Sequence, residues 1–211
     1  MLFDLDGTLL DTLEDIGDSV NKALDDLGFP QHEMGEYRYF IGEGIVTLAA
    51  RALPEKHGGP AMVEKLLVGI RAEYARRWAD RTRPYEGVPE MLDALTVRGS
   101  GMAVLSNKPH DFTQLAVTTL LSKWRFEVVM GATPSRPKKP DPAGALETAR
   151  RMNLTPSQFA YVGDSGIDME TASAAGMYGV GALWGFRPAS ELLASGAKEL
   201  IEKPGELLKL L

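Results

Sequence analysis

The sequence predicts an α/β fold: a doubly wound parallel sheet with a helical domain inserted after its first strand. Three observations predict it. Short apolar runs alternate with helical patterns over the second part of the chain. These runs are continuously apolar, which is typical of strands covered on both faces. A long helical stretch separates the opening apolar run from the others, and this indicates an insertion.

The opening strand is very short, because only Met1, Leu2 and Phe3 precede the first acid, Asp4. Either the natural start lies upstream of Met1, or neighbouring strands must hold Asp4 in place. No second strand is convincing before residue 80. Apolar residues at helical spacing predict a helix over 13–29, with Gly28 as a C-terminal cap, and further helices over 44–53 and 61–79.

The pattern changes after Arg81, where turn residues lead into a helix that ends near Arg98. Apolar runs then predict strands at 101–108, 126–131, 158–165 and 178–185, with helices such as 112–122 and 142–153 between them. We therefore expect an α/β core of residues 1–14 and 83–211, and a helical domain of residues 15–82. The linkers would be Thr12–Asp15 and Arg81–Tyr85.

Composition excludes several classes of function. The 211 residues carry a net charge of −6, without the basic surplus of a nucleic-acid-binding protein. The absence of cysteine excludes disulfides and thiolate sites and suits a cytoplasmic location. The sequence has no apolar run long enough for a membrane helix and no basic signal-peptide region at its start. We expect neither a nucleic acid nor a membrane as partner, and a monomer or homodimer.

Polar residues gather where the predicted strands end. Asp4 and Asp6 are two apart, so both can face one side while Leu5 turns into the core. The other strand ends and the loops near them supply Ser106, Asn107, Lys108, Lys138, Lys139, Asp164 and Asp168. Ligands of such sheets bind beyond the carboxyl ends of the strands. We therefore expect these side chains to share one crevice.

This set of side chains suits phosphate chemistry. Clustered carboxylates repel one another unless a cation neutralises them, and oxygen ligands without His or Cys favour Mg²⁺. A lysine, a hydroxyl and backbone N–H groups can meet the charge of a phosphate. One carboxylate can attack phosphorus, and a second can protonate the leaving oxygen and then activate water. Asp4 and Asp6 have the spacing for these two tasks.

Four motifs in order, DLDGT, SNK, KPDP and GDSGID, resemble the haloacid dehalogenase superfamily over nearly the whole chain. The resemblance implies Asp4 as nucleophile and Asp6 as general acid/base, with the Asp6 backbone carbonyl as a metal ligand. It further implies that Thr8 steadies the loop and orients Asp6, and that Ser106 and the Asn107 amide bind phosphate, for which Lys108 is a further candidate. Lys139, which directly precedes the proline of K-P-x-P, is favoured over Lys138 as the lysine that neutralises phosphate. Asp4, Asp6, Asp164 and Asp168 would form the Mg²⁺ site.

The helical domain is expected to choose the substrate. Gly42 and Gly44 flank Glu43 just before a predicted helix, whose N-terminus could receive a carboxylate together with Arg38. Glu43 would repel an anion unless it points away. This stretch, with YEGVPEML and SNKP, is similar to the phosphoglycolate phosphatase subgroup, which makes 2-phosphoglycolate the first substrate to consider.

Several alternatives stay open on the sequence. Because Asp6 and Asp164 are both present, phosphoryl transfer is favoured over dehalogenation. A phosphomutase would use the same pair of acids, and sugar phosphatases and pyrophosphatases share many of the motifs. A non-catalytic protein that binds phosphorylated metabolites is a further reading, against which the intact Asp4, Asp6, Lys139 and Asp164 argue.

Overall fold

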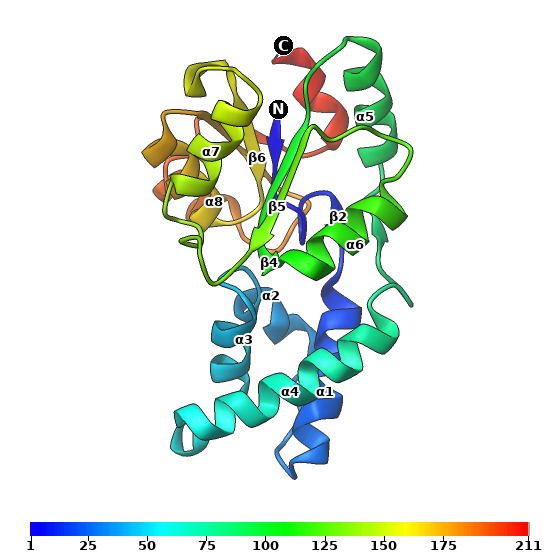
Figure 1. Cartoon of the computed structure of the whole chain (residues 1–211), viewed down its shortest axis with the longest axis vertical. Coiled ribbons are helices and arrows are strands. Elements are labelled where there is room, and N and C mark those ends of the chain that lie inside the picture. Colours follow the sequence, from blue (N-terminus) through cyan, green and yellow to red (C-terminus); the bar gives the residue numbers. More distant parts are fainter. Residues whose placement is uncertain (211) are drawn as a thin grey trace. The chain divides into compact units, whose positions relative to one another are not determined.

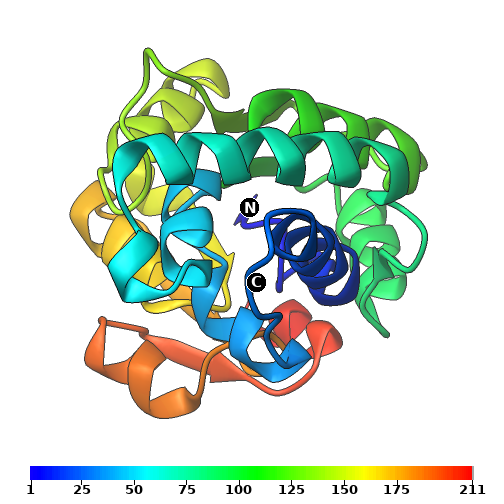
Figure 2. The same ribbon diagram turned by 90° about the horizontal axis from the view of Figure 1, so that it is seen from below.

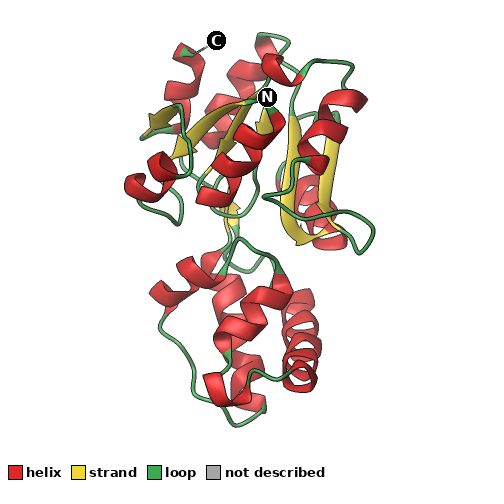
Figure 3. Cartoon of the chain, turned by 90° about the vertical axis from the view of Figure 1, so that its left-hand side faces the viewer, coloured by secondary structure: helices red, strands yellow, loops and turns green. Residues whose placement is uncertain are grey.

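The computed structural model describes residues 1–210 and divides the chain into two compact units. Unit 1 comprises Met1–Asp11 and Pro84–Leu211, and unit 2 comprises Thr12–Arg83. The sequence-based boundaries fell at residues 14/15 and 82/83. Figure 3 shows the sheet with helices around it in unit 1, and helices joined by loops in unit 2.

Unit 1 is built on a six-stranded sheet in the order β5-β4-β1-β6-β7-β8, and every recorded pairing in it is parallel (Figure 1). Its strands are β1 (Leu2–Phe3), β4 (Ala103–Pro109), β5 (Val128–Ala132), β6 (Ala160–Gly163), β7 (Tyr178–Ala182) and β8 (Glu199–Ile201). The helices of this unit are α5 (Val88–Val97), α6 (His110–Leu120), α7 (Ala143–Arg151), α8 (Gly166–Ala175) and α9 (Ala189–Ala194), with 3-10 helices at Pro156–Gln158 and Pro204–Lys209. The prediction of a doubly wound parallel sheet is therefore confirmed.

Strand β1 is short, but it lies at the centre of the sheet. Leu2 pairs with Ala103 of β4 on one side and with Tyr161 of β6 on the other. The chain builds β4 and β5 on one side of β1 and then crosses to β6 on the other side. Such a reversal of strand order opens a crevice at the carboxyl ends of the strands. The neighbouring strands thus hold the backbone that leads into Asp4.

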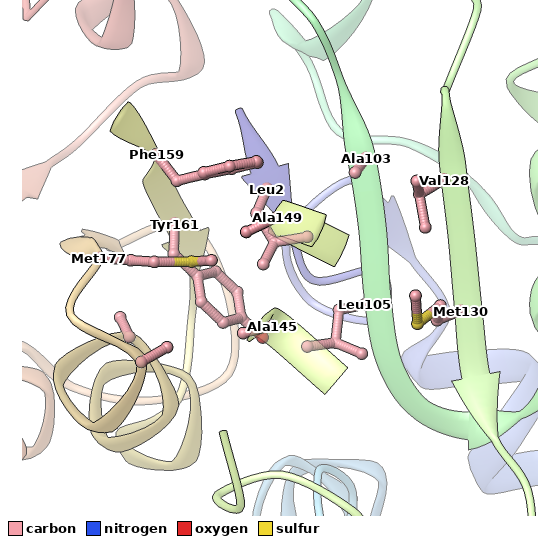
Figure 4. Packing of buried hydrophobic residues seen from close by; sticks show 12 residues of the cluster. Leu2, Ala103, Leu105, Val128, Met130, Ala145, Ala149, Phe159, Tyr161 and Met177 are labelled. Atoms are coloured by element: carbon pink, nitrogen blue, oxygen red, sulfur yellow. The ribbon is translucent and has the colours of Figure 1, made fainter. Parts of the chain in front are cut away.

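Both faces of the sheet are buried. On one face, side chains from β1, β4, β5 and β6 pack against small residues of α7 and α8 (Figure 4). This cluster contains Leu2, Ala103, Leu105, Val128, Met130, Ala145, Ala149, Phe159, Tyr161, Ala172, Ala175 and Met177. The alternate residues Phe3, Val104 and Val162 point to the other face and are buried as well. Burial on both faces explains why the strands are continuously apolar in sequence.

Unit 2 is helical. It contains α1 (Leu13–Asp26), α2 (Tyr37–Phe40), α3 (Ile45–Ala52) and α4 (Pro60–Arg77), with 3-10 helices at Met34–Glu36 and Glu55–His57. Helices α1 and α4 pack against each other (Figure 2). Gly28 has a φ of +74°, and the Phe29 N–H donates to the Leu24 carbonyl, so the predicted glycine cap of α1 is confirmed.

Some predicted elements differ from the observed ones. A small strand β2 (Leu10–Asp11) pairs with β3 (Arg83–Pro84), although no second strand was expected in this part of the chain. Two residues carry no detectable periodicity, so the sequence could not indicate this pair. The run 178–185 was expected to be one strand, but β7 ends at Ala182 and the following residues form a loop.

Candidate active site

Asp4 follows directly on the central strand. Its backbone N–H donates to the Val162 carbonyl at 2.9 Å, which extends the β1–β6 pairing by one residue. The chain then turns tightly, and the Leu5 carbonyl accepts from the N–H groups of Leu9 and Leu10 at 3.0 and 2.9 Å. Leu5 is fully buried, as expected for the residue between two acids that face away from the core. The turn therefore fixes the place of Asp4 through its backbone.

A buried lysine joins two of the predicted acids. Lys139 Nζ lies 2.8 Å from Asp4 Oδ1 and 2.6 Å from Asp168 Oδ1. Burial alone would lower the pKa of Lys139, but the charges of Asp168 and Asp4 hold this pKa well above its ordinary value. The neighbouring Lys138 is exposed. The preference for Lys139 over Lys138 as the lysine of this site thus agrees with the geometry.

The charge balance of this group is unfavourable without a further cation. Burial, followed by the charge of Asp168, raises the pKa of Asp4 to about 8, although Lys139 acts in the opposite direction. The same two causes raise the pKa of Asp164 to about 7. Three buried carboxylates therefore lie together, and Lys139 forms ion pairs with two of them, Asp4 and Asp168.

Both oxygens of Asp164 are fixed by hydrogen bonds. Thr8 Oγ1 donates to Oδ1 at 2.9 Å, and the Phe186 N–H donates to Oδ2 at 2.8 Å. Trp184 Nε1 donates to the Thr8 carbonyl at 2.9 Å, so the loop after β7 contacts the first motif as well as Asp164. A Cβ on Gly185 would lie 2.2 Å from the Asp164 Cβ, which shows why glycine stands there. The Thr8 hydroxyl, which was expected to orient Asp6, donates to Asp164 instead.

Asp168 has structural as well as electrostatic contacts. Ser165 caps α8, and its hydroxyl and N–H donate to Asp168 Oδ2 at 2.6 and 3.1 Å. The Tyr161 hydroxyl donates to Asp168 Oδ1 at 3.2 Å from within the core cluster. Asp168 is completely buried. These hydrogen bonds fix the orientation of the Asp168 carboxylate, which forms an ion pair with Lys139.

The three residues of the SNK motif have different partners. Ser106 Oγ accepts the Lys108 N–H at 3.2 Å. The Asn107 side chain clamps the Lys139 backbone, donating to its carbonyl at 3.0 Å and accepting its N–H at 2.9 Å. Lys108 Nζ lies 3.0 and 3.2 Å from the two carboxylate oxygens of Asp6. Asn107 thus links the end of β4 to the loop that carries Lys139.

The acids of unit 1 can hold a metal ion. Ligand atoms of Asp4, Asp164 and Asp168, all buried, lie within 4.8 Å of one another. This set, searched among the described residues, does not contain the carboxylate of Asp6, whose metal contact was expected through its backbone carbonyl. A ligand set made of buried carboxylates, without histidine or cysteine, fits a hard divalent cation. The donor set therefore agrees with a site for a divalent metal ion.

The predicted substrate residues Arg38, Gly42 and Gly44 belong to unit 2. Gly44 caps the start of α3 with a φ of +89°, and Gly42 has a φ of +121°. Glu43 forms an ion pair with Arg51. Glu43 lies in the loop before α3 and Arg51 lies in the last turn of that helix, so the negative charge of Glu43 has a positive partner within unit 2.

Several residues of the site were not predicted. Tyr161, Trp184 and Gly185 lie within the apolar runs 158–165 and 178–185, and nothing in those runs marked them as residues of the site. A tryptophan and a glycine at the end of an apolar run are only a weak signal for a loop that folds back over the active site. Their partners Thr8 and Asp164 lie far away in sequence, so local patterns could not reveal the contacts.

Comparison with known proteins places this geometry in a family. Residues 1–182 match the model of the haloacid dehalogenase-like hydrolases. A protein of Xylella fastidiosa named phosphoglycolate phosphatase is 33% identical over 205 residues, which are 97% of this chain and 89% of that protein. One of Aquifex aeolicus with the same name is 29% identical over 211 residues, 100% of this chain and 95% of that protein.

Solved structures agree with the sequence relatives. A structure from Lactobacillus delbrueckii, described as a candidate phosphoglycolate phosphatase, superposes with a TM-score of 0.93 at 26% identity and covers 99% of this chain and 96% of that one. No helix within residues 1–210 combines the length and the apolar character needed to cross a membrane. The match over most of the chain and the relatives of nearly equal length lead to one conclusion: the chain belongs to the haloacid dehalogenase-like hydrolases.

Proposed function

We propose that this protein is a Mg²⁺-dependent phosphatase of small phosphorylated metabolites, with 2-phosphoglycolate as the first candidate substrate. One observation carries the proposal: Asp4, at the end of the central strand, shares a buried cluster with Asp164, Asp168 and Lys139. A potential nucleophile beside an excess of negative charge suits a reaction that brings a cation and a phosphate together. The name of the relatives supports the choice of substrate.

Asp4 and Asp6 divide the chemistry. A carboxylate oxygen of Asp4 attacks phosphorus, the bond from phosphorus to the ester oxygen breaks, and Asp6 gives its proton to the departing alkoxide. In the second half, Asp6 takes a proton from water while the water oxygen attacks phosphorus of the aspartyl phosphate. The bond to Asp4 then breaks, which releases inorganic phosphate and restores both acids.

The remaining residues of unit 1 bind and orient. Asp4, Asp164, Asp168 and the Asp6 carbonyl would hold Mg²⁺, which when bound neutralises charge on the cluster and on the phosphate. Lys139 adds a fixed positive charge beside Asp4. Ser106 and the Asn107 amide are proposed to bind the phosphate oxygens.

Unit 2 is proposed as the domain that selects the substrate. Arg38 and the backbone N–H groups of the Gly42–Gly44 loop are the proposed contacts for a substrate carboxylate, supported by the pairing of Glu43 with Arg51. A cytoplasmic location and a monomer or homodimer stay predictions.

The test is phosphate release from about a hundred phosphorylated metabolites, measured with and without Mg²⁺. We expect Mg²⁺-dependent release with the highest kcat/KM for 2-phosphoglycolate. No release from any compound, despite measurable ligand binding, would instead support a non-catalytic binding protein. Incorporation of ¹⁸O from water into phosphate at every turnover separates a phosphatase from a phosphomutase, which would not incorporate label.

A further inference from the structure

Each acid of the first motif has its own buried lysine. Asp4 lies beside Lys139, and Asp6 lies beside Lys108, whose ammonium contacts both carboxylate oxygens of Asp6. The side chains of Lys108 and Asp6 are only 4% and 10% exposed. A donor shared by both oxygens, with little water to compete, restricts the rotation of the carboxylate as well as its place.

The backbone of Lys108 is also held. Its N–H donates to Ser106 Oγ at 3.2 Å, and its carbonyl accepts from Thr113 Oγ1 at 3.1 Å. At this point the pairing of β4 with β5 is irregular. Leu105 pairs with Met130, and the next recorded pair is Pro109 with Ala132. The chain therefore advances four residues along β4 but only two along β5. The two extra residues of β4 form an irregularity that re-aims side chains at the strand end.

The glycine opposite this irregularity makes it possible. A Cβ on Gly131 would lie 2.4 Å from Thr113 Oγ1 and 2.7 Å from the Lys108 carbonyl oxygen. Any larger residue there would displace the contacts that fix Lys108. The irregular end of β4 thus positions the ammonium of Lys108 beside the Asp6 carboxylate.

We infer that Lys108 is a positioning residue for Asp6 rather than a phosphate ligand. It holds the Asp6 carboxylate where Asp6 exchanges protons with the leaving oxygen and with water. The inference rests on the proposed function, because it assigns Lys108 to one half of that chemistry. It differs from the expectation for SNK, in which Lys108 would bind the phosphate directly.

The test is a double-mutant cycle with two substrates. Wild type, Lys108→Met, Asp6→Asn and the double variant are assayed with Mg²⁺ on 2-phosphoglycolate and on p-nitrophenyl phosphate. The alkoxide of the first must receive a proton, whereas p-nitrophenolate leaves without one. Lys123→Met, which removes an exposed lysine, serves as the matched control. Lys108→Arg keeps the charge, and thermal unfolding of each variant verifies folding.

If Lys108 acts through Asp6, Lys108→Met lowers kcat/KM about a hundredfold on 2-phosphoglycolate and about tenfold or less on p-nitrophenyl phosphate, because kcat/KM reports the half of the reaction in which the leaving oxygen departs. In the Asp6→Asn background the same change has no further effect. The inhibition constant for inorganic phosphate stays within about twofold, since ground-state binding is not altered. Lys108→Arg, which keeps the positive charge, recovers part of the lost kcat/KM. If Lys108→Met does not fold, Lys108→Arg takes its place in the double-mutant cycle with Asp6→Asn.

Other results overturn the inference. Equal losses of kcat/KM on both substrates, an additive loss in the Asp6→Asn background, or weaker phosphate inhibition with unchanged kcat would make Lys108 an independent phosphate contact. A wild type that hydrolyses neither ester contradicts the proposed function itself. A wild type that hydrolyses both, with Lys108→Met unaffected, contradicts only the role of Lys108.

Discussion

Two regions of the molecule bury carboxylates in opposite ways. In unit 2, Asp15 is 2% exposed and accepts hydrogen bonds from the N–H groups of Arg81 and Thr82 and from the Thr82 hydroxyl, the last at 2.7 Å. In unit 1, Asp4 lies beside two other buried acids and shares one lysine with Asp168. Asp15 thus accepts several hydrogen bonds, whereas Asp4 has the shared ammonium of Lys139 beside it and other carboxylates around it.

The difference separates a structural acid from a reactive one. A buried charge is tolerable when hydrogen bonds replace its lost hydration, and this is the situation of Asp15. Asp15 therefore joins the start of α1 to the end of the helical unit. Asp4 and Asp164 instead have raised pKa values, which is typical of groups kept for chemistry or for a cation that the fold itself does not supply.

The same substitution, Asp to Asn, can be made at Asp4 and at Asp15, and we expect the largest effect at Asp4. Asp4→Asn removes the proposed nucleophile, so turnover should fall by more than about a thousandfold. The metal-free protein should unfold at the same or a higher temperature at pH 9, because a poorly compensated charge is gone. Steady-state assays and calorimetry measure both quantities. Activity above about a hundredth of wild type would exclude a covalent mechanism through Asp4.

The next largest effect is expected at Gly185. Gly185→Ala places a Cβ 2.2 Å from the Asp164 Cβ and 2.4 Å from the Gly7 carbonyl oxygen, so the loop or Asp164 must move. We expect about 1–3 kcal/mol of lost stability and weaker Mg²⁺ binding by calorimetric titration. Gly205→Ala is the matched control, since its Cβ would meet no atom within 4 Å. Equal Mg²⁺ affinities for both variants would show that this loop does not position Asp164.

At Asp15 the prediction concerns stability. Asp15→Asn replaces one acceptor oxygen with a donor facing N–H groups, which should cost about 1–3 kcal/mol of unfolding free energy. Below its unfolding temperature the variant should keep kcat within about tenfold of wild type, in contrast to Asp4→Asn. Urea unfolding and kinetic assays test the pair. A stable Asp15→Asn variant would contradict the structural role.

The last prediction concerns the pH dependence of the metal-free protein. Asp4 and Asp164 bind protons more tightly in the folded state, with pKa values of about 8 and 7, than in the unfolded chain, where 3.8 is the ordinary value. Their contribution to stability is therefore present at low pH and is lost as pH rises from about 4 through 8. Added Mg²⁺ should oppose the loss at the upper end.

The measurement is the unfolding temperature between pH 5 and 9, with EDTA or with Mg²⁺. We expect the gain from Mg²⁺ to grow with pH and to shrink in Asp4→Asn. A gain that is the same at pH 5 and pH 9 would show that the ion binds elsewhere, away from these acids.

The sequence by itself determined the sheet, the inserted helical stretch and the residues of the core motifs. Period-two spacing predicted that Asp4 and Asp6 face one side of the chain, and the resemblance to the haloacid dehalogenase superfamily favoured Lys139 over Lys138. Periodicity, turn residues and strand ends are local signals, because each is encoded by residues within a few positions of one another.

The tertiary structure decided which side chains meet. Lys108 contacts Asp6 across 102 positions of sequence, and Trp184 contacts Thr8 across 176. No local pattern encodes such pairs, because they depend on strand order and on the irregular end of β4. The number of donors around each buried acid likewise follows from packing, and that number distinguishes Asp15 from Asp4.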